Sequence, residues 1–216
     1  MVTALYRDYF TLALPLQTKS RPMSEPSAPA APHWQWLPWQ PGTPAEDTAR
    51  RWLAPQLQTP PQAIALIRDR HGRPRLQVPA DADVGWSHSG AGLLLAYGRG
   101  VALGIDLERE RPRPRALALA RRFFDVSEAQ WLQAQADEAA RTAAFVRLWC
   151  AKEAVLKAHG RGLAFGLHRL AFAERDGALV LAQADPALGD AAHWQLREFV
   201  PHPGYRAALA WKPLPG

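Results

Sequence analysis

The clearest hydrophobic pattern in the chain lies between residues 92 and 108. Two mostly apolar runs, 92–97 and 101–108, are separated by the turn sequence Gly98-Arg99-Gly100. Short apolar runs bounded by glycine are typical of buried strands, and a short glycine-rich turn between two such runs favours a hairpin. We therefore predict two neighbouring, paired strands over this region.

Other apolar patterns predict short strands and several helices. Asp47 is a suitable N-cap for a short helix that reaches residue 57. Further helices are predicted at 116–124, after an N-cap at Ser127, and from about Glu138 to His159 between Asp137 and Gly160. Further strands are predicted at 63–67, 75–78, 170–173, 178–182, 193–200 and 205–211. Because strands and helices are mixed rather than strictly alternating, the predicted fold class is α+β.

The first residues differ in composition from the rest. Residues 18–32 are rich in serine, proline and alanine without apolar periodicity, so we expect residues 1–32 to form a flexible N-terminal extension. Met23 lies within it, and either Met1 or Met23 could be the physiological start. The chain lacks an apolar run of roughly 18 residues, a secretory signal and a second cysteine besides Cys150. We therefore expect a cytoplasmic protein with no membrane partner.

The charge balance favours an acidic or phosphorylated partner. The 216 residues carry a formal net charge of +6, and only four of the 26 basic residues are lysines. Nucleic acid, a phosphorylated cofactor or an acidic protein would each suit this excess. A non-enzymatic nucleic-acid-binding protein is the alternative interpretation, based on the arginine-rich stretch 109–115 and nine tryptophans. No recognised nucleic-acid motif supports it, so we expect no nucleic-acid partner.

The first motif with chemical potential is the pair Asp106 and Glu108 on the second predicted strand. Side chains two residues apart on a strand point to the same face, so the two carboxylates lie side by side. Adjacent carboxylates repel unless a positive charge lies between them, and a hard divalent cation is the usual solution. A solvated strand end is the simpler explanation of this segment alone.

The second motif lies on the long predicted helix. Glu153 and Lys157 are four residues apart and therefore neighbours on one face, which is also the geometry of an ordinary helical ion pair. Lys152 falls near the centre of the apolar stripe. Either its stem packs while its ammonium reaches a polar group, or the assumed helical phase is off.

The third motif is Trp86-Ser87-His88-Ser89-Gly90, which we place at the start of a strand. A histidine flanked by hydroxyl residues and glycine can approach a phosphate with side-chain and backbone donors together. An ordinary surface histidine is the simpler interpretation.

Taken in order, the motifs resemble those of one enzyme family, the 4′-phosphopantetheinyl transferases of the surfactin-synthetase-activating type. The resemblance covers about Arg70 to Leu163. It rests on these segments: Gly72-Arg73-Pro74, Trp86-Ser87-His88-Ser89, Gly104-Ile105-Asp106-Leu107-Glu108, Phe123-Phe124 with Glu128, Trp149-x-x-Lys152-Glu153-Ala154-x-x-Lys157, and Gly160-x-Gly162-Leu163.

The resemblance implies a role for each matching residue. The Mg²⁺ ligands would be Asp106, Glu108 and Glu153; the catalytic residues would be Glu153, Lys157 and Glu128. The coenzyme A contacts would be Lys157 at the pyrophosphate, His88 with Ser87 at the 3′-phosphate, and Arg73, where the family usually has lysine. Arg50 and Arg51 are candidates for further coenzyme contacts. Whether Glu153 acts as the base directly or through a metal-bound water stays open.

The resemblance also implies an architecture and a reaction. The fold would be a pseudo-dimer of two similar α+β halves, 33–102 and 103–216, with the coenzyme in the cleft between them. Such a chain is expected to be a monomer. It would transfer 4′-phosphopantetheine from coenzyme A to a serine of an apo acyl or peptidyl carrier protein. The docking surface for that acidic partner would lie on segment 109–124, where Leu117 and Leu119 are interleaved with Arg111, Arg113, Arg115, Arg121 and Arg122.

Overall fold

The computed structural model describes residues 30–214, and in this part of the chain two three-stranded antiparallel sheets dominate. In spatial order, the first consists of β1 (His33–Pro38), β5 (Gly92–Arg99) and β4 (Ala82–Ser89). The second consists of β6 (Val101–Arg109), β10 (Tyr205–Pro213) and β9 (Gln195–Phe199). Two hairpins are formed by β2 (Leu66–Arg68) with β3 (Pro74–Leu76), and by β7 (Leu170–Arg175) with β8 (Ala178–Ala184). Most of the predicted extension, residues 1–29, lies outside the described residues.

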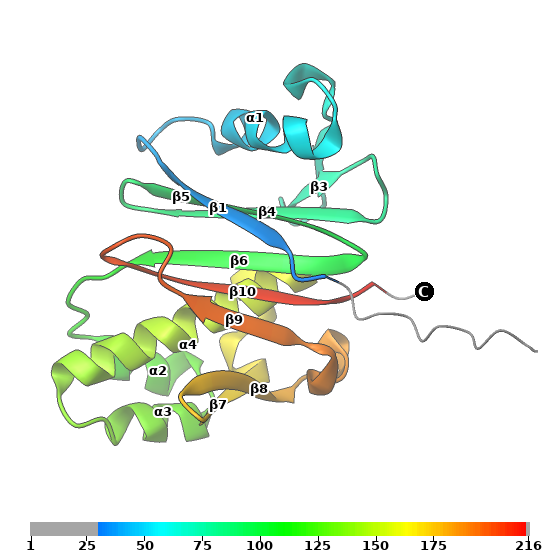
Figure 1. Ribbon diagram of the computed structural model, residues 1–216. Helices are drawn as coiled ribbons and strands as arrows, with labels where there is room; N and C mark the ends of the chain where they lie inside the picture. Colours follow the sequence, from blue (N-terminus) through cyan, green and yellow to red (C-terminus); the bar gives the residue numbers. More distant parts are fainter. Residues whose placement is uncertain (1–29, 215–216) are drawn as a thin grey trace, which may run out of the picture.

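The two sheets pack against each other between layers of helix (Figure 1). Helix α1 (Ala45–Leu57) covers the outer face of the first sheet, and α4 (Glu138–His159) covers the second. Helices α2 (Ala116–Phe123) and α3 (Val126–Gln133) lie beyond α4, near the β7–β8 hairpin. The mixture of antiparallel sheets and helices confirms the predicted α+β class. Among residues 30–214, no helix has the length and apolar character needed to cross a bilayer.

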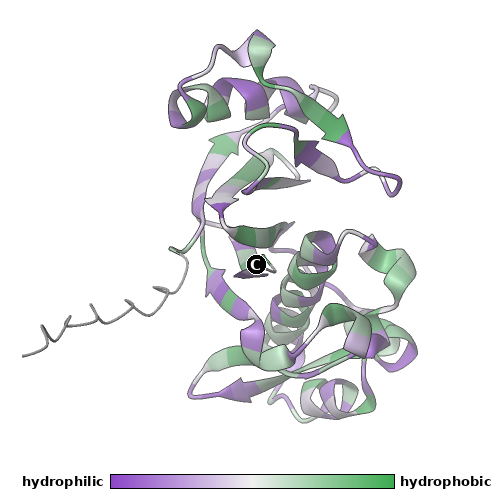
Figure 2. Ribbon diagram, turned by 90° about the vertical axis from the view of Figure 1, so that its right-hand side faces the viewer, coloured by the Kyte–Doolittle hydropathy of each residue, from purple (hydrophilic) through white to green (hydrophobic). Residues whose placement is uncertain are grey.

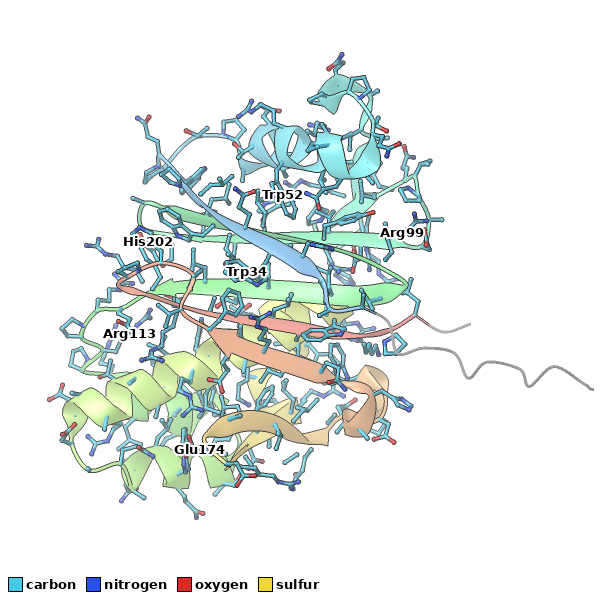
Figure 3. The ribbon with its side chains drawn as sticks, viewed as in Figure 1. Trp34, Trp52, Arg99, Arg113, Glu174 and His202 are labelled. Carbon is cyan, nitrogen blue, oxygen red and sulfur yellow. The ribbon has the colours of Figure 1, made fainter. Side chains whose placement is uncertain are left out.

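Separate hydrophobic clusters hold these layers together. The cluster between the sheets contains Leu103, Ile105 and Leu107 of β6, packed against residues of β5 and against Trp34 of β1 (Figure 3). Trp52 of α1 packs on the first sheet from the other side. In Figure 2, α1 carries hydrophilic and hydrophobic colours along its turns, as expected for a helix with one buried face. The largest cluster joins α4 to the second sheet and to the β7–β8 hairpin.

Two expectations about the strands were wrong. Strands β5 and β6 are consecutive but do not pair, because the turn at Gly100 (φ +68°) carries the chain from the first sheet to the second. Strand β5 is apolar on both faces, and β6 is apolar as far as Ile105, because each strand lies between two layers; such a pattern does not specify a pairing partner. Trp86-Ser87-His88-Ser89 forms the second half of β4 rather than the start of a strand.

The helix boundaries agree with the sequence in two cases and differ in two. Helix α2 begins at Ala116 as predicted and ends at Phe123, one residue before the predicted end. Helix α4 is capped by the side chain of Asp137 and ends at Gly160, which has the left-handed φ of +93°. Helix α3, in contrast, is capped by Asp125 through a capping box with Glu128, so Ser127 is already helical. Helix α1 begins after Pro44 and contains Asp47 in its first turn. Several residues near a helix start can satisfy backbone N–H groups, so composition alone leaves the cap undecided.

Strand β6 and helix α4 approach so closely that one glycine is required between them. A Cβ atom added to Gly104 would lie 2.1 Å from the carbonyl oxygen of Ala154 and 2.4 Å from the nitrogen of Ala158. Both atoms belong to the backbone of α4, which cannot rotate away as a side chain can. Gly104 therefore fixes the spacing between the two elements that carry the candidate site.

Replacing Gly104 by alanine should destabilise the protein by about 3 kcal/mol or more, since the added methyl group forces β6 away from α4. Gly85→Ala is the matched control, because a Cβ there has its nearest neighbour at an ordinary 3.4 Å. Urea denaturation of both variants measures the difference. Equal free energies of unfolding for the two variants would contradict the close packing at Gly104.

Candidate active site

Asp106 and Glu108 lie on the face of β6 that is turned toward α4. Ile105 and Leu107 alternate with them and are buried in the cluster between the sheets. The period of two therefore places both carboxylates in one pocket of about 390 Å³. Asp106 is buried, and Glu108 is partly exposed.

Helix α4 contributes the opposite wall of this pocket. Trp149, Glu153 and Lys157 are spaced by four residues and line the pocket together. The sequence predicted Glu153 and Lys157 as neighbours, and the helix brings both to the carboxylates of β6. Trp149 packs against Phe145 with the rings tilted by 30° and 5.8 Å between their centroids, which supports this wall from behind.

A three-way contact joins β4, β6 and α4 inside the pocket. The Lys157 ammonium donates to Asp106 Oδ1 at 2.5 Å and to the Ser87 hydroxyl at 3.0 Å. The Ser87 hydroxyl in turn donates to Asp106 Oδ1 at 2.9 Å. Burial acts to lower the pKa of Lys157, but the charge and hydrogen bond of Asp106 outweigh it, so the pKa is raised. Lys157 is therefore a charged group.

Glu108 has a different positive partner. Arg113, in the connection between β6 and α2, donates to Glu108 Oε2 at 2.6 Å (Figure 3 labels Arg113). The Ser89 hydroxyl lies 3.4 Å from the same oxygen. Nothing in the sequence motifs pointed to Arg113 as a partner of Glu108, because the contact depends on how the connection folds back.

Glu153 has neither a described ion pair nor a described hydrogen bond. Burial raises its pKa to about 7, and the charges of Asp106 and Glu108 act in the same direction while Lys157 opposes them. The carboxyl of Glu153 therefore takes up and releases a proton near neutral pH. This is the property expected of a general base.

The three carboxylates were expected to hold Mg²⁺, and their donor chemistry fits such an ion. Carboxylate oxygens are the ligands that Mg²⁺ prefers, and Asp106 Oδ2 is buried without a hydrogen-bond partner. Among residues 30–214, however, no three acidic, histidine or cysteine side chains are already gathered as metal ligands. Lys157 and Arg113 supply the positive charge at Asp106 and Glu108 in this arrangement.

A second pocket, of about 260 Å³, adjoins the first. Trp86 and Lys157 line both pockets, so Lys157 lies at their boundary. The walls of the second pocket are rich in basic and glycine residues, namely Arg68, His71, Gly72, Arg73, Gly160 and Gly162. The two pockets together extend from the carboxylates to a basic region.

Arg73 lies in the second pocket but is held tightly by the protein. Its guanidinium forms a buried ion pair with Asp83 and donates to the carbonyl oxygen of Leu103 at 2.6 Å. Burial lowers the pKa of Arg73, and Asp83 opposes this effect. Its Nη1 atom is buried without a hydrogen-bond partner and is therefore the part of Arg73 that can still receive an acceptor.

Ser87 and His88 were expected to contact the 3′-phosphate together, but their side chains point in different directions. As neighbours on β4 they point to opposite faces. Ser87 contacts Asp106, whereas the exposed His88 ring stacks on Trp39 with 4.2 Å between ring centroids. Both residues still line the first pocket.

Glu128 does not lie in the pocket. It forms a fully buried ion pair with Lys152 at 2.7 Å and accepts a hydrogen bond from the backbone of Phe172. The Lys152 ammonium also donates to two backbone carbonyl oxygens, those of Leu167 and Leu170. Of the two alternatives for Lys152, the first is therefore correct: its ammonium reaches polar groups inside the protein. Glu128 has a structural role as the buried partner of this ammonium.

Arg50 and Arg51 also lie elsewhere. Arg50 forms an ion pair with Glu46 at 2.8 Å and donates to the carbonyl oxygen of Ile64. Arg51 is exposed and contacts Thr48 of the same helix. Neither residue lines either pocket, so the structure does not support them as coenzyme contacts.

Comparison with known proteins defines the class of this fold and site. Residues 102–210 match the family model described as the 4′-phosphopantetheinyl transferase superfamily. These residues make up half of the chain and contain Asp106, Glu108, Glu153 and Lys157, so the protein belongs to this superfamily.

Individual relatives are similar over part of their length. A Synechocystis sp. protein whose name assigns it provisionally as a 4′-phosphopantetheinyl transferase is 35% identical over 147 residues, 67% of this chain and 58% of the relative. The chain thus spans less than two thirds of that protein. The crystal structure of Thermotoga maritima holo-[acyl-carrier-protein] synthase is 22% identical, with a TM-score of 0.42 over 52% of this chain and 62% of that one.

The buried pair Glu128–Lys152 makes a testable contribution to stability. Lys152→Met leaves the Glu128 carboxylate buried without a counter-ion, which should cost about 3–5 kcal/mol at pH 7. Lys152→Met combined with Glu128→Gln should recover part of this loss, because the neutral amide can still accept from Phe172. Urea denaturation measures both.

The pH dependence provides the control. Burial already raises the pKa of Glu128, and loss of Lys152 raises it further. The folded variant then binds a proton more readily than the unfolded chain. The loss in free energy of unfolding of Lys152→Met relative to wild type should therefore become smaller as the pH falls from 7 toward 5. A deficit that does not change with pH would show that Glu128 is not the group left unpaired.

Proposed function

We propose that this protein transfers the 4′-phosphopantetheine group from coenzyme A to a serine hydroxyl of an apo acyl or peptidyl carrier protein. The products are the holo carrier protein and adenosine 3′,5′-bisphosphate. The observation that carries this proposal is the single pocket in which Asp106, Glu108, Glu153 and Lys157 meet, in a chain that belongs to the 4′-phosphopantetheinyl transferase superfamily.

The residues of the pocket suit attack on a diphosphate. Such a reaction requires neutralisation of the phosphate oxygens and alignment of the nucleophile more than covalent catalysis. Lys157 lies at the boundary between the two pockets, where its ammonium can turn from Asp106 to a phosphate oxygen. Asp106, Glu108 and Glu153 would hold Mg²⁺, which supplies further neutralisation when bound.

Glu153 is the base that we assign to the serine hydroxyl. Its pKa of about 7 keeps a substantial fraction ionised at neutral pH, and the absence of a described hydrogen bond leaves its oxygens available.

The second pocket is the proposed site of the nucleotide. Arg73, with its unpartnered Nη1, and the neighbouring Arg68 and His71 provide positive charge for a phosphate. His88 lines the first pocket from the edge of β4 and is the proposed contact to the 3′-phosphate, with Ser87 positioning Asp106 and Lys157.

We propose the surfactin-synthetase-activating type because one chain supplies both walls of the site. The first sheet comes from residues 33–99 and the second from residues 101–213, so the change of sheet at Gly100 lies close to the proposed boundary between halves 33–102 and 103–216, which falls near the start of β6. The first half contributes Trp86, Ser87 and Arg73, and the second contributes the carboxylates. A pseudo-dimer within one chain needs no second copy, so we propose a monomer.

The carrier protein is proposed to dock on α2 and the connection before it. Arg115 and Arg122 are exposed on one face of α2, and Phe123 is 39% exposed beside them. Arg113 was expected to belong to this surface, but its pairing with Glu108 removes it. A basic surface with an apolar centre complements a carrier protein that is acidic around its serine.

Substitutions of the carboxylates test the reaction. Asp106→Asn and Glu153→Gln should each lower kcat/KM about a hundredfold or more, since each removes an oxygen ligand or the base. The control is Glu138→Gln, at an exposed position of α4, the helix that carries Glu153; it should leave kcat/KM unchanged. Mass spectrometry of the carrier protein measures transfer. EDTA should abolish it and Mg²⁺ restore it; near wild-type transfer by either variant would refute the assignment.

Charge reversal on α2 tests the docking surface. Arg115→Glu with Arg122→Glu should raise KM for the carrier protein several-fold at low salt. The increase should be smaller at physiological salt, because dissolved ions screen interactions between exposed charges over about 8 Å. KM for coenzyme A should stay constant. The control, Arg51→Glu with Arg197→Glu, makes the same charge change at exposed positions on α1 and β9. Equal effects of both pairs would exclude docking on α2.

A further inference from the structure

The connection between β6 and α2 brings a positive charge to a candidate metal ligand. Arg113 follows Glu108 by only five residues, yet the chain folds back so that its Nη2 lies 2.6 Å from Glu108 Oε2. Both side chains are mostly buried, with 17% and 19% of their surfaces exposed. The contact is therefore a defined part of the fold and not a passing surface pair.

The two positive partners of the pocket differ in how they are anchored. Lys157 belongs to the long helix α4 and is held by two acceptors, Asp106 and Ser87. Arg113 belongs to the irregular connection between β6 and α2, and its Nε atom is buried without a hydrogen-bond partner. Arg113 thus has one described acceptor, whereas Lys157 has two.

Two of the three carboxylates in the pocket already have a cationic partner. Asp106 faces Lys157 and Glu108 faces Arg113, while Glu153 has no cationic partner of its own within the described part of the chain. A divalent cation at Glu108 would repel the guanidinium and would compete with it for Oε2. The cation and the Arg113 guanidinium therefore cannot both bind Glu108 Oε2 strongly.

We propose that Arg113 is a positioning residue that occupies Glu108 in place of the divalent cation and has to withdraw before the cation binds. This inference rests on the proposed function, in which Asp106, Glu108 and Glu153 hold Mg²⁺. Arg113 keeps the acidic pocket stable before loading, and it sets the affinity for the ion by competition.

Direct measurement of Mn²⁺ binding to the full chain, by electron paramagnetic resonance of the free ion and without coenzyme A, tests this competition. Arg113→Gln should bind Mn²⁺ about three- to tenfold more tightly than wild type, the range expected for removal of a partly buried competing ion pair. Arg113→Lys, which keeps the charge but loses the planar fork, should give an intermediate affinity.

The matched control is Arg111→Gln, which removes the same charge from the same connection at an exposed position. Its Mn²⁺ affinity should stay within about twofold of wild type. Equal tightening in Arg111→Gln and Arg113→Gln would attribute the effect to net charge and overturn the proposal, as would an unchanged affinity in Arg113→Gln. Should Arg113→Gln fail to fold, the lysine variant still decides, because competition requires its affinity to exceed that of wild type.

The Mn²⁺-binding experiment tests the role of Arg113 independently of the transfer assay that tests the proposed function. Tighter Mn²⁺ binding by Arg113→Gln with no phosphopantetheine transfer by wild type would support the competition and refute the proposed function. Transfer by wild type with identical Mn²⁺ affinities in all variants would do the reverse.

Discussion

The close contact between β6 and α4 is the constraint on which the rest of the structure depends. With no side chain at Gly104, the strand lies against the helix backbone at Ala154 and Ala158. That spacing brings Asp106, two residues along β6, within 2.5 Å of the ammonium of Lys157 on α4. A wider separation would leave the buried Asp106 carboxylate without its cation, which is far less favourable than separating an exposed pair. The geometry of the pocket is thus a consequence of backbone packing, and the side chains follow from it.

The pocket also shows how a fold accommodates several acids in one place. Asp106 and Glu108 each have a cation within hydrogen-bond distance, while Glu153 responds to burial with a pKa near 7. Burying several carboxylates close together is unfavourable, and two effects reduce that cost here: a carboxylate is neutralised either by a cationic partner or by a bound proton. The acid without a partner is the one whose protonation is most easily changed, and this distinguishes Glu153 chemically from its neighbours.

Much of the site could be predicted from local periodicity. The spacing of two on a strand and of four on a helix correctly grouped Asp106 with Glu108 and Glu153 with Lys157. Periodicity could not show that Glu128 pairs with Lys152, because that contact depends on how α3 packs across α4. For the same reason, a run of apolar residues identified β5 and β6 as strands but not the sheets to which they belong. The largest errors lie where distant segments meet, whereas the errors within single elements concern only their boundaries.

The pairing of β6 has a consequence for how the chain folds. Its partner in the sheet is β10, with Arg109 opposite Tyr205 and Val101 opposite Pro213, so about a hundred residues separate the paired positions. Closing so long a loop costs entropy that is recovered only when the ladder forms, and such non-local pairing slows folding. On the ribosome, β6 emerges long before β10 is synthesised. The strand that bears the acids therefore gains its sheet neighbour β10 only after the intervening residues, which include all of α4, have been synthesised.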